Sequence, residues 1–81
     1  MFFDGFCFIR RAGVTPEGWA QLDLKDVNGS FDWNWYLSKP EISREVLATA
    51  LVAISCDKTL TVQIEDASVP WSRVIRCLVD K

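Results

Sequence analysis

The stretch that decides the fold runs from Trp19 to Leu37 and reads WAQLDLKDVNGSFDWNWYL. Apolar and polar residues alternate on both sides of Asn28-Gly29, a dipeptide that accepts the two positive φ angles of a type I′ hairpin turn. A two-residue loop fixes the pairs on the apolar face as Leu24–Trp33, Leu22–Trp35 and Ala20–Leu37. The sequence therefore predicts a β-hairpin whose inner face carries Trp33 and Trp35.

The same register gives the hairpin a polar outer face, with the pairs Lys25–Asp32, Asp23–Asn34 and Gln21–Tyr36. Trp19 and Tyr36 fall on this face, and Trp71 falls in a later loop. Aromatic rings with a polar tip, placed among polar side chains, are typical of sugar sites and protein interfaces. We expect Trp19, Tyr36 and Trp71 to form a binding or interface site. The alternative is that these rings lie half buried over the rim of the fold and bind nothing.

The remaining segments predict three more strands and one helix. Phe2–Arg11 is apolar on both faces, which favours a central strand that is covered on both sides. Ser38-Lys39-Pro40-Glu41 has the form of a capping box, and apolar residues then recur at helical spacing through Ile42–Ile54. The second half of that helix is apolar nearly all round, so we expect it to be buried against more than one surface. Thr59–Glu65 alternates strictly and predicts a strand with one solvated face, and Arg73–Val79 is the last strand.

Three strands, a helix and two strands predict an α+β fold with five strands, in a single domain of 81 residues. One arrangement with this order is an OB-fold, a five-stranded Greek-key barrel in which the helix lies between strands three and four. The other is an α+β sandwich with the helix across one face of the sheet.

Composition argues against several functions. The net charge is −2, and Lys and Arg are scattered among acidic residues, so we expect no binding to nucleic acid. The chain has no histidine, which excludes Ser-His-Asp and Cys-His nucleophile systems. No spacing predicts a metal site or a cofactor, and we assign no catalytic residue. A small enzyme or enzyme accessory would have to use a carboxylate pair such as Asp23 with Asp26 or Glu65 with Asp66.

The three cysteines are Cys7, Cys56 and Cys77, an odd number without close spacing. This favours three buried thiols that behave as small hydrophobic residues, and it argues against a disulfide framework. The apolar start of the chain lacks the basic region of a signal peptide, and no apolar run approaches the length of a membrane span. We therefore expect a cytoplasmic protein that does not associate with a membrane.

From Trp35 to Val79 the chain resembles the B subunits of AB5 toxins, particularly those of the subtilase-cytotoxin and pertussis-like type. The resembling features are the aromatic pair Trp35-Tyr36, the Ala- and Leu-rich helix Val46–Ile54, the strand Lys58–Asp66 and a closing strand around Ile75. The resemblance implies an OB-fold subunit of a pentameric ring that binds glycans. The chain differs in having no Gly where the helix ends, and no glycan-binding residue carries over. It also resembles orphan proteins encoded on bacterial mobile gene cassettes.

These observations predict a self-assembling binding module. A domain of this size has a thin margin of stability, and a partner subunit is one way to increase it. Exposed aromatic rings and a helix that is apolar all round are typical of interfaces. We expect a homo-oligomer that binds a small molecule or a glycan, and a glycan-binding ring subunit is the more specific alternative.

Overall fold

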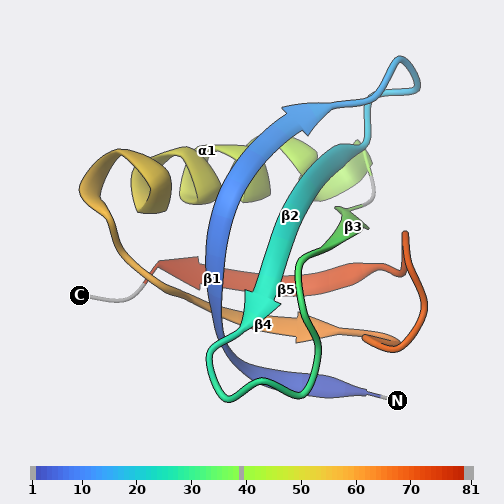
Figure 1. Ribbon diagram of the computed structural model, residues 1–81. Coiled ribbons are helices and arrows are strands. Elements are labelled where there is room, and N and C mark those ends of the chain that lie inside the picture. The colour runs from blue at the N-terminus through green and yellow to red at the C-terminus, as the bar shows by residue number, and fades with distance from the viewer. Residues whose placement is uncertain (1, 39, 80–81) are drawn as a thin grey trace.

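Six elements follow one another in the order that the sequence predicts (Figure 1). The computed structural model describes residues 2–38 and 40–79. Its elements are β1 (Phe3–Val14), β2 (Ala20–Asp26), β3 (Asn34–Ser38), α1 (Pro40–Cys56), β4 (Leu60–Ile64) and β5 (Val74–Val79). The α+β class and the order βββαββ are thereby confirmed. In this part of the chain, no helix combines the length and the apolar character that crossing a membrane requires.

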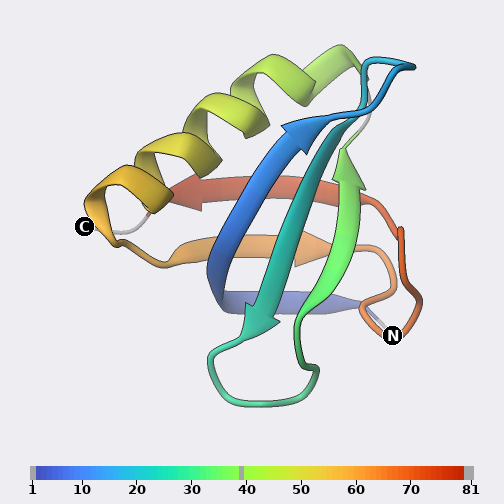
Figure 2. The ribbon, with the colours of Figure 1, turned by 45° about the horizontal axis from the view of Figure 1, so that its top comes forward.

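The strands form one antiparallel sheet in the order β3-β2-β1-β4-β5, so β1 is central, as its apolar sequence predicts. Phe3 to Cys7 pair with β4, whereas Cys7 to Val14 pair with β2. Between these two pairings β1 bends sharply, so that its first part lies along β4 and the rest along β2 (Figures 1 and 2). One strand thus belongs to both halves of a strongly curved sheet.

The two edge strands approach each other without forming a ladder, so the sheet is not closed. Over the described residues, their contact is an isolated parallel bridge between Leu37 and Arg73. Two backbone hydrogen bonds accompany it. The Leu37 N–H donates to the Ser72 carbonyl at 2.9 Å, and the Trp71 N–H donates to the Trp35 carbonyl at 2.8 Å. The segment before β5 is thereby fixed to β3.

The core lies between the concave inner face of the sheet and one face of α1. Tyr36 is its largest fully buried side chain, and its hydroxyl donates to the carbonyl of Ala67 at 2.7 Å. From the helix, Val46, Ala50 and Ala53 are buried. The expectation that α1 is covered on more than one side is wrong, because Leu51 and Val52 on its other side are each 48% exposed.

The hairpin register differs from the prediction by one residue. Leu22 pairs with Tyr36 and Asp23 pairs with Trp35, so the predicted pairs of Leu22 with Trp35 and Asp23 with Asn34 are wrong. Because side chains alternate along a strand, this slip turns every side chain of β3 to the opposite face. Tyr36 therefore enters the core, and Trp35 lies on the outer face.

The observed register goes with a longer loop, which is built on the side chain of Asp26. Its two carboxylate oxygens accept the backbone N–H groups of Asn28 and Ser30, at 3.1 Å and 2.8 Å. The Asp26 N–H donates to the Phe31 carbonyl at 3.3 Å, so the loop is longer than two residues. A type I′ turn requires positive φ at both central residues, whereas here Gly29 has a φ of 86° and Asn28 has no positive φ.

Both ends of α1 depart from the expected capping. Ser38 is buried at the end of β3, and among the described residues its hydroxyl has no hydrogen-bond partner, so the predicted capping box does not form. Lys39 lies outside the described residues. At the other end Asp57 takes the left-handed conformation with a φ of 55°. The Lys58 N–H donates to the Ala53 carbonyl at 2.8 Å, which makes a Schellman motif with Asp in the usual place of Gly.

Candidate functional site

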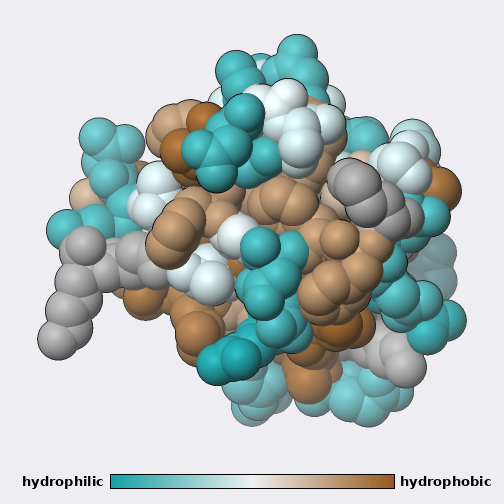
Figure 3. All heavy atoms as spheres, turned by 90° about the horizontal axis from the view of Figure 1, so that it is seen from below, coloured by the Kyte–Doolittle hydropathy of each residue, from teal (hydrophilic) through white to brown (hydrophobic). Residues whose placement is uncertain are grey.

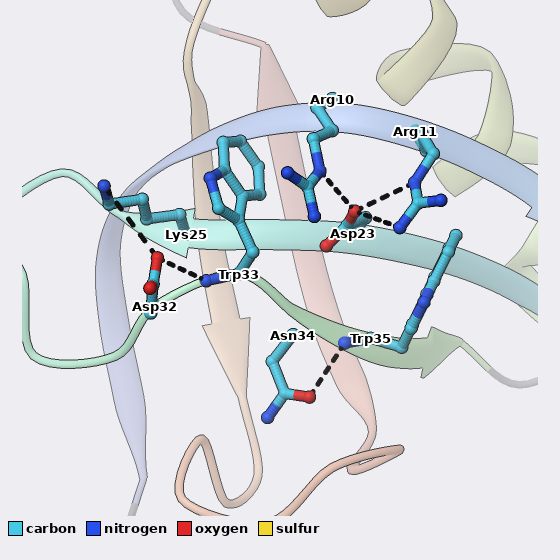
Figure 4. Close-up of polar contacts among 8 residues, drawn as sticks. All are labelled: Arg10, Arg11, Asp23, Lys25, Asp32, Trp33, Asn34 and Trp35. Atoms are coloured by element: carbon cyan, nitrogen blue, oxygen red, sulfur yellow. Dashed lines mark hydrogen bonds and ion pairs between the residues drawn. The ribbon is translucent and has the colours of Figure 1, made fainter.

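Two arginines, an aspartate and two tryptophans gather on the outer face of β1, β2 and β3 (Figure 4). Arg11 pairs with Asp23 across β1 and β2, and Asp23 pairs with Trp35 across β2 and β3, so these three side chains share one face. Arg10 joins them because the register shifts between Ile9 and Arg11. Such a bulge adds a residue to one strand and re-aims its side chain. Two consecutive arginines therefore reach the same carboxylate.

Asp23 is the buried centre of this group. Its Oδ2 accepts Arg10 Nε at 2.7 Å, Arg11 Nε at 3.0 Å and Arg11 Nη2 at 2.9 Å. The Asp23 side chain is only 2% exposed, whereas the side chains of Arg10 and Arg11 are 49% and 58% exposed. A buried carboxylate needs such partners, because an unpaired charge out of water is costly. The two arginines shield Asp23 from solvent while they remain accessible themselves.

Each guanidinium also lies over an indole ring. Arg10 Cζ is 4.5 Å from the centre of the Trp33 ring, and Arg11 Cζ is 4.9 Å from that of Trp35. Both distances are within the range of cation–π attraction. Asp23 and the two rings together hold the planes of the guanidinium groups in fixed positions.

Trp71 extends this surface from the loop before β5. Its ring stacks on that of Trp35, with the ring centres 6.0 Å apart and the planes 4° from parallel. Its backbone has a φ of 66°, a left-handed conformation that bulky residues rarely adopt. The side chain nevertheless remains 51% exposed. Strained backbone of this kind persists only where the surrounding structure enforces it, and it is concentrated at functional sites. We name the arginine–tryptophan face by its members: Arg10, Arg11, Asp23, Trp33, Trp35 and Trp71.

The three residues predicted to form a site do not come together. Trp71 belongs to the arginine–tryptophan face. Tyr36 does not belong to this face, because its side chain is fully buried in the core, so its predicted place on an open polar face is wrong. The burial raises the pKa of the Tyr36 hydroxyl to about 12. Trp19 lies in the β1–β2 loop, where its backbone N–H donates to Thr15 Oγ1 at 3.1 Å. Within residues 2–38 and 40–79, no ring contact joins Trp19 to Trp71.

The sequence predicts Trp33 and Trp35 in the core, assigns no role to Arg10 and Arg11, and offers Asp23 only as one member of a carboxylate pair with Asp26. That pair does not form, because Asp23 bonds the arginines whereas Asp26 accepts backbone N–H groups of its own loop. Trp33 and Trp35 are instead only partly buried and lie on the outer face. One signal could have found them. Asp26 stands two residues before Asn28, and Asp commonly accepts the backbone N–H two residues further on, in an Asx-turn. A loop built on Asp26 would have indicated the observed register.

Two acidic residues beyond this face, Asp26 and Asp66, accept hydrogen bonds within their own loops. Asp26 caps its loop; burial acts to raise its pKa, but the hydrogen bonds from Ser30 and Asn28 outweigh this and lower it below its ordinary value of 3.8. Asp66 accepts the backbone N–H of Ser68 at 3.1 Å. Across the described ranges, no group of three or more Cys, Asp or Glu side chains could hold a metal ion.

Other exposed features lie apart from the arginine–tryptophan face. A pocket of about 240 Å³ lies between β1 and the end of α1, and its lining is Phe8, Ile9, Ala53, Ile54, Asp57, Lys58 and Thr59. It contains one acidic residue and no tryptophan, so it gathers no carboxylate pair. The prediction that all three thiols are buried is wrong, because Cys56 is exposed and Cys77 is only partly buried, whereas Cys7 is buried. Among the described residues, none of the three forms a disulfide.

Phe6 and Phe8 are 53% and 43% exposed, so the outer face of β1 is not covered as its sequence predicts. Phe6 pairs with Thr61, which pairs with Leu78, and this register places Phe6 and the 46% exposed Leu78 on the same outer face. Viewed from below, hydrophobic side chains gather over the middle of the molecule with hydrophilic ones mostly around them (Figure 3). The molecule therefore exposes apolar side chains on the outer face of β1 and β5.

Comparison of the chain with protein-family models, with curated proteins and with solved structures finds no match.

Proposed function

We propose that this chain is a non-catalytic binding module, that the arginine–tryptophan face is its ligand site, and that the ligand is a carbohydrate. One observation carries the proposal. The ring of Trp71 is held against Trp35 by a left-handed backbone and yet remains half exposed. A purely structural ring would gain most by full burial, because burial of apolar area is what stabilises packing. An enforced and exposed stack is instead suited to contact with a ligand.

The chemistry of the face suits a sugar. An indole offers a flat apolar surface to the C–H groups of a pyranose ring, and its N–H remains available to a polar partner. Beside the tryptophans, the guanidinium groups of Arg10 and Arg11 offer hydrogen-bond donors to hydroxyl and carboxylate oxygens. An apolar surface beside a few fixed polar groups is the usual composition of a small-ligand site.

Charge argues against single-stranded nucleic acid as the ligand. Such binding depends on several basic side chains that follow a phosphate backbone. Here two arginines share one carboxylate, and the chain as a whole carries a net charge of −2. A ligand with one anionic group, or with none, fits this balance better than a polyphosphate does.

We also propose that the fold is a partly open OB-type barrel. Three features support this: β1 is shared by both halves of the sheet, α1 lies between β3 and β4, and β3 meets the start of β5 in a parallel bridge. OB-folds bind oligosaccharides and oligonucleotides on the face of strands two and three. The arginine–tryptophan face lies on these strands and on β1. The resemblance to toxin B subunits is in keeping with both proposals.

Isothermal titration calorimetry with soluble oligosaccharides tests the proposed ligand class. A panel of cello-, malto-, chito- and galacturono-oligosaccharides covers neutral, acetylated and acidic sugars. We expect at least one to bind, and Trp71→Ala to weaken that binding roughly tenfold or more, since buried aromatic contacts dominate such interfaces. Trp19→Ala is the matched control and should bind like the wild type. A panel without any binder, or equal binding by Trp71→Ala, would refute the proposal.

Self-association is a second candidate function, and the exposed outer face of β1 and β5 favours it. Phe6 of β1 and Leu78 of β5 are exposed on this face, and the edge strand β5 also exposes Ile75 and Val79, by 45% and 39%. Apolar residues on an open strand edge are prone to pair with another chain. Light scattering coupled to size exclusion should give a mass that is a multiple of 9.2 kDa, and Phe6→Ser with Leu78→Ser should reduce it. A wild-type monomer at micromolar concentration would exclude stable self-association.

A further inference from the structure

We infer that the preferred carbohydrate is an acidic oligosaccharide, of which one carboxylate binds across Arg10 and Arg11 while the sugar rings lie against the tryptophan stack of Trp35 and Trp71. This inference rests on the proposed function, because it names the class of ligand for the same face. The observations that carry it are the unused donors of the two arginines, the local charge, and the position of both arginines beside the exposed tryptophan stack.

The first observation concerns hydrogen-bond donors. A guanidinium has five N–H donors and no acceptor. Arg10 bonds Asp23 through Nε only, and Arg11 through Nε and Nη2. These contacts engage one nitrogen of Arg10 and two of Arg11 at a single oxygen atom, so both guanidinium groups have further N–H donors to offer a ligand. The paired N–H donors of a guanidinium form a planar fork that matches the two oxygens of a carboxylate. Hydrogen bonds between two charged groups are also stronger than hydrogen bonds between neutral groups.

The second observation is charge. Two guanidinium groups face a single carboxylate, so the cluster carries an excess of one positive charge. Asp23 is buried, so a ligand meets the exposed arginines rather than the carboxylate. One additional carboxylate neutralises the cluster, so only one unit of an acidic oligosaccharide needs to reach it. A sugar unit with one carboxylate meets this requirement, and a neutral sugar leaves the excess charge without a partner.

The third observation is position. Arg11 and Trp71 both contact the ring of Trp35, with Arg11 Cζ 4.9 Å from the ring centre and the two ring centres 6.0 Å apart. The cationic fork and the exposed stacking surface are therefore neighbours on one indole. In a uronic acid the carboxylate carbon is bonded directly to the sugar ring. A chain of uronic acid units that extends from Trp71 along Trp35 therefore brings a carboxylate to the arginines.

Calorimetry with a matched pair of probes tests the inference. The probes are tetragalacturonate and its methyl ester, which keep the same rings and differ in charge. We expect the acid to bind roughly tenfold tighter than the ester in the wild type, as one charge-assisted pair would give. Arg11→Gln and Arg10→Gln should each remove most of this preference. Arg44→Gln, at an exposed position of α1, is the matched control and should keep it.

Each single variant leaves one arginine on Asp23, so the buried carboxylate keeps a partner and the fold is expected to persist. Circular dichroism and a thermal melt confirm this before binding is measured. Arg10→Lys is a second variant that keeps the charge but loses the fork, and it should show an intermediate preference.

The outcomes separate the inference from the proposed function. If acid and ester bind equally and Trp71→Ala weakens both, the face binds carbohydrate and the inference of an acidic sugar falls. If neither probe binds the folded wild type, the inference of an acidic sugar falls. If the neutral oligosaccharides also fail to bind, the proposed function falls with it. If a single-stranded oligonucleotide binds tighter than tetragalacturonate and the arginine variants abolish this, the face is a nucleic-acid site and both are wrong.

Discussion

Trp71 lies parallel to Trp35, although one ring comes from the loop before β5 and the other from β3 at the opposite edge of the sheet. A backbone hydrogen bond of 2.8 Å from the Trp71 N–H to the Trp35 carbonyl accompanies the stack. Aromatic pairs in this arrangement add roughly 0.5–1.5 kcal/mol beyond the burial of their surface. The contact joins the two edges of the sheet at the point where the proposed ligand binds.

The left-handed backbone of Trp71 predicts an unusual order of stability among its variants. Trp71→Ala and Trp71→Gly both remove the ring, but only glycine adopts a φ of 66° without strain. We therefore expect the glycine variant to be more stable than the alanine variant by about 1 kcal/mol in urea unfolding. Val69, which is exposed and has no positive φ, gives the control: there alanine should be the more stable. If the alanine variant of Trp71 is as stable as the glycine variant, the backbone at residue 71 is not strained and the prediction is wrong.

Asp26 predicts a dependence of stability on acid. Asp26→Asn has one acceptor oxygen where the wild type uses two, so it should lose about 1 kcal/mol at neutral pH. The pKa of Asp26 is lowered in the folded state, so its contribution is full above the ordinary value of 3.8 and is lost as pH falls through the lowered value. Urea unfolding on the acid side should therefore show a shallower loss in Asp26→Asn. Glu17→Gln, in the exposed β1–β2 loop, is the control. Parallel acid curves for wild type and Asp26→Asn would contradict the capping role.

How far the sequence predicts this fold depends on whether one face of a strand is clearly apolar. β4 alternates strictly, and its Leu60, Val62 and Ile64 are buried as predicted. β3 is different, because aromatic residues occupy both of its faces. With Trp33 and Trp35 on one face and Tyr36 on the other, either register buries an aromatic face. The loop around Asp26 decides between the two registers, and alternation alone contains no information about it.

The arginine–tryptophan face could not be assembled from the sequence for a related reason. In a regular strand Arg10 and Arg11 point to opposite faces, and only the bulge after Ile9 brings both to Asp23. Nothing in the local sequence marks that bulge. The sequence predicts Trp71 as a site residue in a loop, but it predicts the stacking partner Trp35 in the core. Conversely, the sequence predicts Tyr36 on the outer face, whereas the observed register places it in the core.

Tyr36 predicts a loss of stability at alkaline pH. Its hydroxyl donates to the buried Ala67 carbonyl, so Tyr36→Phe should lose about 1–2 kcal/mol at neutral pH. Burial raises the pKa of Tyr36 from 10.0 to about 12, so its contribution is full below 10.0 and is lost as pH rises through about 12. Urea unfolding as a function of pH should show less alkaline loss in Tyr36→Phe than in the wild type. Equal stability of the two proteins at neutral pH would mean that the hydroxyl contributes nothing.

The three thiols should react at three different rates. Cys56 is exposed and should react first with a thiol reagent, and the partly buried Cys77 should follow. Cys7 should react last, because burial raises the pKa of its thiol from 9.0 to about 12 and the thiolate is the reactive form. Cys56→Ser should lose only the fast phase. Under denaturing, non-reducing conditions all three should titrate, whereas a single thiol per chain would reveal a disulfide and contradict the structure.

The most direct test of the binding face is an NMR titration that follows the indole N–H signals of the four tryptophans. Single Trp→Phe variants assign the signals, and tetragalacturonate is added to the intact chain. We expect the signals of Trp33, Trp35 and Trp71 to shift with one common affinity, because Trp33 and Trp35 each contact an arginine and Trp71 stacks on Trp35. The signal of Trp19, in the β1–β2 loop, should stay in place. Binding that shifts only Trp19, or that moves none of the four signals, would contradict this expectation.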